Sequence, residues 1–160
     1  MKNVEQFFDS IRKGDEAQCR GLLSGQPELL NSRDQRGSTP LILATYYNQL
    51  GIVQLLLDEN VDINEKDSSG NTALMGVCFK GYDPIAKLLL ERGAEINNQN
   101  AMGSTALIYA ATFGQLEIAK MLLRYKADPS IKDHRGNTAL DHATLNNLPP
   151  LVELLQNSVG

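Results

Sequence analysis

The sequence has little of what most catalytic and metal sites require. It contains two histidines, two cysteines and no tryptophan. A zinc site needs three or four converging ligands, whereas His134 is expected at a loop tip and His142 on a helix. Because no spacing matches a metal motif, both histidines are interpreted as polar residues of the last part of the chain. We therefore expect no metal and no cofactor.

The motifs of common enzymes are also missing. There is no G-x-S-x-G around a serine nucleophile, no glycine loop that could hold a phosphate and no closely spaced cysteine pair. The glycines recur periodically and are already used by turns. The chain is therefore predicted not to be an enzyme.

The two cysteines are expected to be reduced core residues. Cys19 and Cys78 fall on predicted helix faces in distant parts of the chain, where a free cysteine behaves as a small apolar residue. A disulfide is the less favoured alternative, because it requires Cα atoms within about 7 Å of each other.

Clusters of basic residues and long apolar runs are missing too. The net charge is −4, and the affinity of DNA-binding proteins comes from clustered lysine and arginine, so no nucleic acid partner is expected. Glu5 and Asp9 interrupt the N-terminal segment, which has no apolar run long enough for a signal peptide. We expect a protein of the cytoplasm without membrane contact. A periplasmic or secreted location stays open if a leader has been removed.

What the sequence does contain is a pattern that recurs about every 33 residues. Four positions keep their residue type in each copy, without an insertion: an aspartate or asparagine, a glycine, a threonine and a leucine. These are Asp34, Asp67, Asn100 and Asp133; Gly37, Gly70, Gly103 and Gly136; Thr39, Thr72, Thr105 and Thr138; and Leu41, Leu74, Leu107 and Leu140.

One copy, residues 100–132, illustrates what each unit is expected to form. Gly103 suits a positive φ in a turn, and Thr105 can cap the helix that follows. Apolar residues then recur at helical spacing in two short segments, separated by Gly114. Two helices of this length cannot bury their apolar faces alone, so the unit needs neighbours on both sides.

The threonine-containing segments read TPLILA, TALMGV, TALIYA and TALDHA. They resemble the T-P-L-H-x-A signature of the ankyrin repeat. The resemblance implies an all-α fold, an α-solenoid of about five stacked helix-turn-helix units with projecting hairpin loops. The segment PELLNSRD also looks like that of small stand-alone bacterial ankyrin proteins.

The repeat register predicts one ankyrin-repeat domain over residues 1–160. Residues 1–33 lack the turn and the threonine and are expected to form an N-terminal cap, with a lengthened loop over residues 26–31. Complete repeats are expected at 34–66, 67–99 and 100–132, followed by a C-terminal cap repeat at 133–160.

Three residues replace glycine where a helix ends. Asn48 and Asn147 close first helices, and asparagine tolerates the left-handed conformation there. Lys126 stands where Gly93 stands one unit earlier. We therefore predict a positive φ at Lys126, at a cost of about 1 kcal/mol.

The resemblance implies a binding groove lined by the hairpin tips and the inner side of the first helices. The constant interval places Tyr46, Phe79, Thr112 and Leu145 in one column, and Tyr47, Lys80, Phe113 and Asn146 in the next. Aromatic side chains dominate interface hot spots. The alternative is that these rings only cover the helix ends. The predicted protein-binding residues are Arg36, Tyr46, Tyr47, Ser69, Phe79, Lys80, Met102, Tyr109, Thr112, Phe113, Arg135 and Leu145.

The family histidine is absent from all four units, which carry Ile42, Met75, Ile108 and Asp141 instead. Apolar packing is expected to replace its hydrogen bonds. We predict a monomeric, non-catalytic module that binds another protein. The alternative is a dedicated regulatory or protective subunit of a single enzyme.

Overall fold

The computed structural model describes residues 2–159 and contains ten α-helices, one 3₁₀ segment and, within that range, no strand. The elements are α1 (Lys2–Lys13), α2 (Glu16–Gly25), η1 (Pro27–Asn31), α3 (Pro40–Tyr46), α4 (Leu50–Asp58), α5 (Ala73–Lys80), α6 (Asp83–Glu91), α7 (Ala106–Thr112), α8 (Leu116–Arg124), α9 (Ala139–Leu145) and α10 (Pro149–Val159). The predicted all-α solenoid is confirmed.

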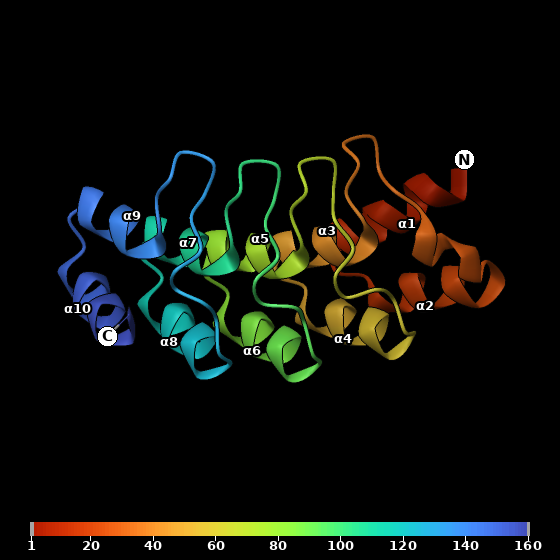
Figure 1. Ribbon diagram of the computed structural model, residues 1–160. Coiled ribbons are helices and arrows are strands. Elements are labelled where there is room, and N and C mark those ends of the chain that lie inside the picture. The colour runs from red at the N-terminus through yellow and green to blue at the C-terminus, as the bar shows by residue number, and fades with distance from the viewer. Residues whose placement is uncertain (1, 160) are drawn as a thin grey trace.

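The helices form two parallel rows, with hairpin loops projecting beyond one of them (Figure 1). The row beside the hairpins consists of the first helices, α1, α3, α5, α7 and α9, and each contacts the next. The other row consists of the second helices, α2, α4, α6, α8 and α10, which also contact in order. The two ends of the chain lie at opposite ends of this stack.

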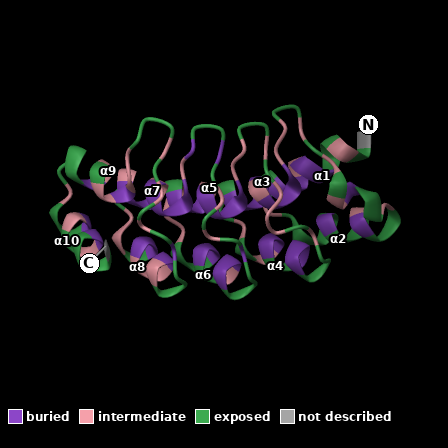
Figure 2. Cartoon of the chain, viewed as in Figure 1, coloured by how far each residue is buried: buried purple, intermediate pink, exposed green. Residues whose placement is uncertain are grey.

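The core lies between the rows, and both helices of every unit contribute buried residues to it (Figure 2). The first helices contribute small residues, with Ala44, Val77, Ala110 and Ala143 at the same register position and all fully buried. The second helices contribute the equally buried column Leu56, Leu89, Leu122 and Leu155. Small residues on the first helices let the rows approach closely, while leucines fill the space between neighbouring units.

The local predictions from the register are confirmed at the helix ends. The hydroxyls of Thr39, Thr72, Thr105 and Thr138 each accept a hydrogen bond from the amide three residues later. Positive φ angles occur at Asn48, Lys126 and Asn147. Gly103 is needed for a further reason, because a Cβ there would lie 2.8 Å from the amide nitrogen of His134 in the next hairpin.

Two expectations need correction. The lengthened loop expected at residues 26–31 is mostly regular. Pro27–Asn31 forms the 3₁₀ segment η1, which buries Leu29. Apolar packing is expected where the family histidine is missing, but Asp141, which stands at that position in the last unit, makes a polar contact instead. Its carboxylate accepts a hydrogen bond from the Thr138 amide and completes a capping box at the start of α9.

Candidate functional site

A hollow of about 1130 Å³ opens between the hairpins and the first helices, over the first four units of the stack. The first helices α1, α3, α5 and α7 form its floor. The hairpins around residues 34–38 and 67–71 form one wall. Its lining residues are Val4, Glu5, Phe8, Arg12, Ser32, Arg33, Asp34, Gln35, Arg36, Ser38, Ile42, Leu43, Tyr46, Tyr47, Asp67, Asn71, Thr72, Met75, Gly76, Phe79, Tyr109 and Phe113.

Four exposed rings, which we name the aromatic patch, lie at this hollow: Tyr46, Tyr47, Phe79 and Phe113. Their exposed fractions are 49%, 42%, 44% and 45%. The centroids of Tyr46 and Tyr47 are 5.3 Å apart, and those of Phe79 and Phe113 are 4.7 Å apart, both with edge-to-face geometry. The patch therefore consists of two packed pairs rather than four isolated rings.

The position of these rings follows from the ends of the first helices. Tyr46 and Phe79 lie in the last turns of α3 and α5, while Tyr47 and Phe113 follow α3 and α7 directly. The inward side of each helix is already filled by small buried residues, so a large ring at these positions has no interior space. The rings therefore stay on the concave surface.

The contacts between units run diagonally across the two predicted columns. The Lys80 ammonium nitrogen lies 4.6 Å from the centroid of the Tyr46 ring, and Phe113 packs on Phe79 in the same way. The Asn146 amide donates to the Thr112 carbonyl at 3.2 Å. Consecutive helix residues point about 100° apart, so the second-column side chain turns toward the preceding unit. Each of these contacts joins the second column to the first column of the preceding unit.

Tyr109 joins the patch to the hairpin wall. Its ring is stacked on Phe113 with centroids 6.0 Å apart and an interplanar angle of 13°. Its hydroxyl lies 3.0 Å from the Asn100 side-chain nitrogen and 3.4 Å from the Asn71 side-chain oxygen. Tyr109 therefore lines the hollow and also packs between units.

The hairpin wall uses its carboxylates for its own structure. Oδ1 of Asp34 accepts hydrogen bonds from the amides of Arg36 and Ser38, and Oδ1 of Asp67 accepts those of Ser69 and Asn71. These bonds close the turn at the start of each unit. The periodic aspartates are therefore explained by the hairpins without a ligand.

The cations around the hollow differ in how they are neutralised. Arg12 faces Asp34 at 3.7 Å, and Arg33 pairs with Glu65 at 3.0 Å. Within residues 2–159, Arg36 and Lys80 form no ion pair. The hollow is therefore bordered by two positive charges without a carboxylate partner in the described chain.

The hollow brings together Arg36, Tyr46, Tyr47, Phe79, Tyr109 and Phe113 from the predicted set. The remaining six do not line it. Lys80 and Thr112 lie half-buried beside the patch, Ser69, Met102 and Arg135 are exposed at hairpin tips, and Leu145 is 72% exposed at the end of α9. Leu145 instead borders a smaller hollow with Leu140 and Gln156.

Sequence reasoning missed part of the floor. Leu43 and Gly76 line the hollow and share their register position with Tyr109, so the repeat interval contained this signal. Phe8 and Arg12 come from α1, whose unit lacks the threonine that would set the register, and no signal placed them there.

The C-terminal histidine has a specific structural partner. Nε2 of His142 lies 2.7 Å from Oδ2 of Asp133, whose side chain is only 7% exposed. His142 is thus a polar residue of the last unit, as interpreted from the sequence, and its ring is hydrogen-bonded within that unit. Within residues 2–159 no group of three His, Cys, Asp or Glu side chains is arranged to hold a metal ion.

Both cysteines are buried and free. Burial raises the pKa of the Cys78 thiol. Burial also raises the pKa of Cys19, against the opposing effect of its hydrogen bond with Ser10. Since the thiolate is the reactive form, neither group is suited to act as a nucleophile. None of the helices within residues 2–159 is both long and apolar enough to cross a membrane.

Comparison with known proteins identifies related sequences. A family model described as ankyrin repeats (3 copies) matches residues 7–100 and 92–160. The NAD-capped RNA hydrolase NUDT12 of Homo sapiens is 41% identical to this chain over 59 residues, and so are its counterparts from Macaca fascicularis and Pongo abelii. The aligned segment is 37% of this chain and only 13% of each relative. The activity in that name is therefore not transferred to this chain.

Proposed function

This chain belongs to the ankyrin-repeat family, whose repeats generally mediate protein–protein interaction, and we propose that it is a non-catalytic module that binds a partner protein in its concave hollow. The division into an N-terminal cap at 1–33, repeats at 34–66, 67–99 and 100–132, and a C-terminal cap repeat at 133–160 is part of the same proposal.

The aromatic patch is the observation that supports this function most directly. Four large rings, each more than 40% exposed, lie together at the hollow. Contiguous exposed apolar surface marks binding sites, and a central aromatic residue of an interface contributes about 2 kcal/mol or more. Rings that only covered helix ends would not need to meet across two successive units.

The neighbouring units hold this surface in place through repeated hydrogen bonds. The side chain of Asn64 accepts the Glu95 amide at 2.8 Å, and Asn97 accepts the Asp128 amide at 2.9 Å one unit later. Such hydrogen bonds between units keep the hollow in one shape before a partner binds. Binding then loses little ordering entropy, which favours affinity.

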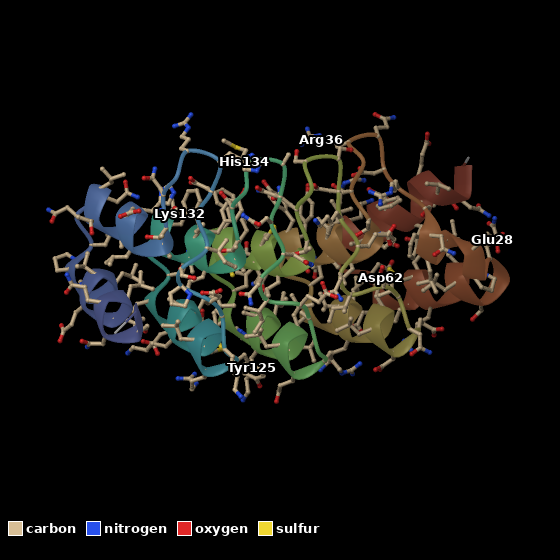
Figure 3. All side chains as sticks on the ribbon, viewed as in Figure 1. Glu28, Arg36, Asp62, Tyr125, Lys132 and His134 are labelled. Atoms are coloured by element: carbon tan, nitrogen blue, oxygen red, sulfur yellow. The ribbon has the colours of Figure 1, made fainter. Side chains whose placement is uncertain are left out.

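The test is a pull-down with purified protein carrying Tyr46, Tyr47, Phe79 and Phe113 changed together to serine. Partners captured by the wild type should be lost with this variant. A control variant with Leu50→Ser and Tyr125→Ser also removes exposed apolar side chains, but neither residue lines the hollow. Figure 3 places Tyr125 at the edge opposite the hairpins. Capture of the same proteins by the wild type and the quadruple variant would refute the proposal.

The same experiment addresses the narrower alternative of a regulatory or protective subunit. One enzyme recovered in a fixed ratio to the bait would support that function, and several unrelated partners would support a general binding module.

The predicted residues outside the hollow are proposed as a second contact region. Ser69, Met102 and Arg135 continue the row of hairpin tips, and Thr112 and Leu145 continue the row of helix ends. A partner longer than the hollow would reach them. Changing Met102 and Leu145 to serine should then weaken capture without abolishing it.

A further inference from the structure

We infer, on the basis of the proposed function, that the partner contributes a segment in which acidic side chains stand next to large apolar ones. Its acidic part lies against the Arg36 hairpin and Lys80, and its apolar part lies on the aromatic patch. The surroundings of each charged group at the hollow favour this partner over a basic one.

The accessible positive charge exceeds the accessible negative charge at the hollow. Arg36 and Lys80 have no carboxylate partner within residues 2–159. Arg12 and Arg33 are paired, but their side chains remain 39% and 40% exposed and can contact a second carboxylate.

The carboxylates of the hollow compensate little of this charge. Asp34 is 8% exposed, faces Arg12 and accepts two amides of its own turn. Asp67 accepts two amides in the same way. Among the described residues, Glu5 is the one carboxylate lining the hollow that is both exposed and without an ion-pair partner. A basic segment would meet two unpaired cations and one free carboxylate.

Charge and apolar surface lie side by side along the stack. Arg36 lies on the hairpin that precedes α3 (Figure 3), and the Lys80 ammonium lies over the Tyr46 ring, with the centroid of the Tyr82 ring 5.9 Å away. Phe79 and Phe113 lie further toward the C-terminal end. Neighbouring packed helices are about 10 Å apart, so α3 and α7 are separated by about 20 Å, which about six residues of extended chain would span.

A peptide selection tests this combination of charge and apolar surface without knowledge of the natural partner. A displayed library of random peptides of about twelve residues is selected on the purified full chain, then counter-selected on the quadruple serine variant. We expect the surviving peptides to combine aspartate or glutamate with leucine, phenylalanine or tryptophan. A synthetic consensus peptide should lose about tenfold in affinity when its acidic residues become amides, and also when ionic strength rises from about 0.05 M to about 0.5 M.

Charge reversal locates the acidic contact. Arg36→Glu together with Lys80→Glu should weaken the consensus peptide about tenfold or more. The matched control, Lys87→Glu with Arg124→Glu, reverses two charges of the second helices outside the hollow and should leave affinity unchanged. Arg36→Glu alone, a change at an exposed hairpin tip, provides the same test if the double variant does not fold.

Several outcomes would overturn the inference. Patch-dependent peptides that lack acidic residues, or that are rich in lysine and arginine, would do so while leaving the proposed function intact. Peptides that bind the quadruple variant equally well, or no peptides at all, would count against both. A fluorescent single-stranded oligonucleotide bound through Arg36 and the patch, or a dimer of this chain abolished by the quadruple variant, would identify a different occupant.

Discussion

Nε2 of His142 lies 2.7 Å from Oδ2 of Asp133, nine residues earlier in the chain. The preceding unit contains the same relationship with different chemistry, because the Asn100 side-chain nitrogen donates to the Tyr109 hydroxyl at 3.0 Å. In both units the first helix is thereby joined to the start of its own hairpin. The two bonds support hairpin orientation, and each can be weakened or removed by a substitution of nearly equal size.

Replacing Asp133 by asparagine should weaken the His142 interaction and keep the turn, because an amide nitrogen at this position has no negative charge and can only donate to the ring. Asn100 occupies the equivalent position, and its Oδ1 accepts two turn amides just as Oδ1 of Asp133 does. We expect Asp133→Asn to lower the free energy of unfolding at pH 7 by about 1 kcal/mol. Urea denaturation measures this difference, and an unchanged midpoint would mean that the negative charge of Asp133 adds nothing to its bond with His142.

Asp133→Asn should also change how the melting temperature depends on pH in the acid range. Burial raises the pKa of the Asp133 carboxyl, but hydrogen bonds from the Asn137 amide, the His142 ring and the Arg135 amide lower it to a net value below the ordinary one. A lowered carboxyl pKa stabilises the fold fully above the unfolded value of about 3.9, and this stability is lost as pH falls through the folded pKa. The melting temperature of Asp133→Asn should therefore fall less between about pH 5 and pH 2 than that of the wild type. Parallel curves would contradict this.

Tyr109→Phe should separate stability from binding. The change removes a hydroxyl that contacts Asn71 and Asn100 but keeps the ring stacked on Phe113. We expect a loss of about 1 kcal/mol in the free energy of unfolding. Capture of partners, and the affinity of a selected peptide, should stay unchanged at temperatures where the variant is folded. A loss of binding with retained fold would place the hydroxyl itself in contact with the partner.

Much of the fold could be predicted because the repeat register is a physical constraint. Thr105 must precede a helix, Gly103 must lie where another hairpin approaches, and Leu122 must fill the space between units, so each residue type fixes a position. The first unit lacks these markers. Its 3₁₀ segment Pro27–Asn31 could not be read from periodicity, because one short turn contains no repeating pattern.

The candidate site was less predictable because exposure and contact depend on side-chain direction. The register placed Tyr46 and Phe79 in one column, but whether Phe113 packs on Phe79 depends on the angle between successive residues of each helix. The accessible charge at the hollow depends on which carboxylates are hydrogen-bonded to the amides of their own turns. The number of aspartates in the sequence does not reveal this. The bond between Asp133 and His142 could not be predicted either, since a separation of nine residues corresponds to no fixed helical contact.

The two thiols should report on local opening of the stack. Burial raises the pKa of both Cys19 and Cys78, so a small aromatic disulfide reagent should react slowly with either in the native protein at pH 8. Terminal repeats contact one neighbour only and open more easily than inner ones. Mass spectrometry should therefore find Cys19 modified before Cys78 as urea is raised. Earlier modification of Cys78 would show that an inner repeat opens first.

Lys126→Gly should raise the melting temperature. Lys126 has φ 72° in the turn after α8, where Gly93 has φ 86° and Asn60 has φ 62° in the equivalent turns. The left-handed conformation costs a lysine about 1 kcal/mol, and the greater freedom of glycine in the unfolded chain offsets about half of this. The net gain is about 0.5 kcal/mol, measured by urea and thermal unfolding.

The reciprocal change, Gly93→Lys, isolates the backbone as the cause. An added Cβ at Gly93 meets no heavy atom within 4 Å, so the expected loss of about 0.5 kcal/mol comes from the positive φ and not from a clash. Both turns follow a second helix on the exposed side of the stack, which makes the pair a matched comparison. If Lys126→Gly leaves the melting temperature unchanged while Gly93→Lys lowers it, the lysine side chain must make a compensating interaction. If neither changes stability, the backbone at these turns relaxes out of the left-handed region at no cost.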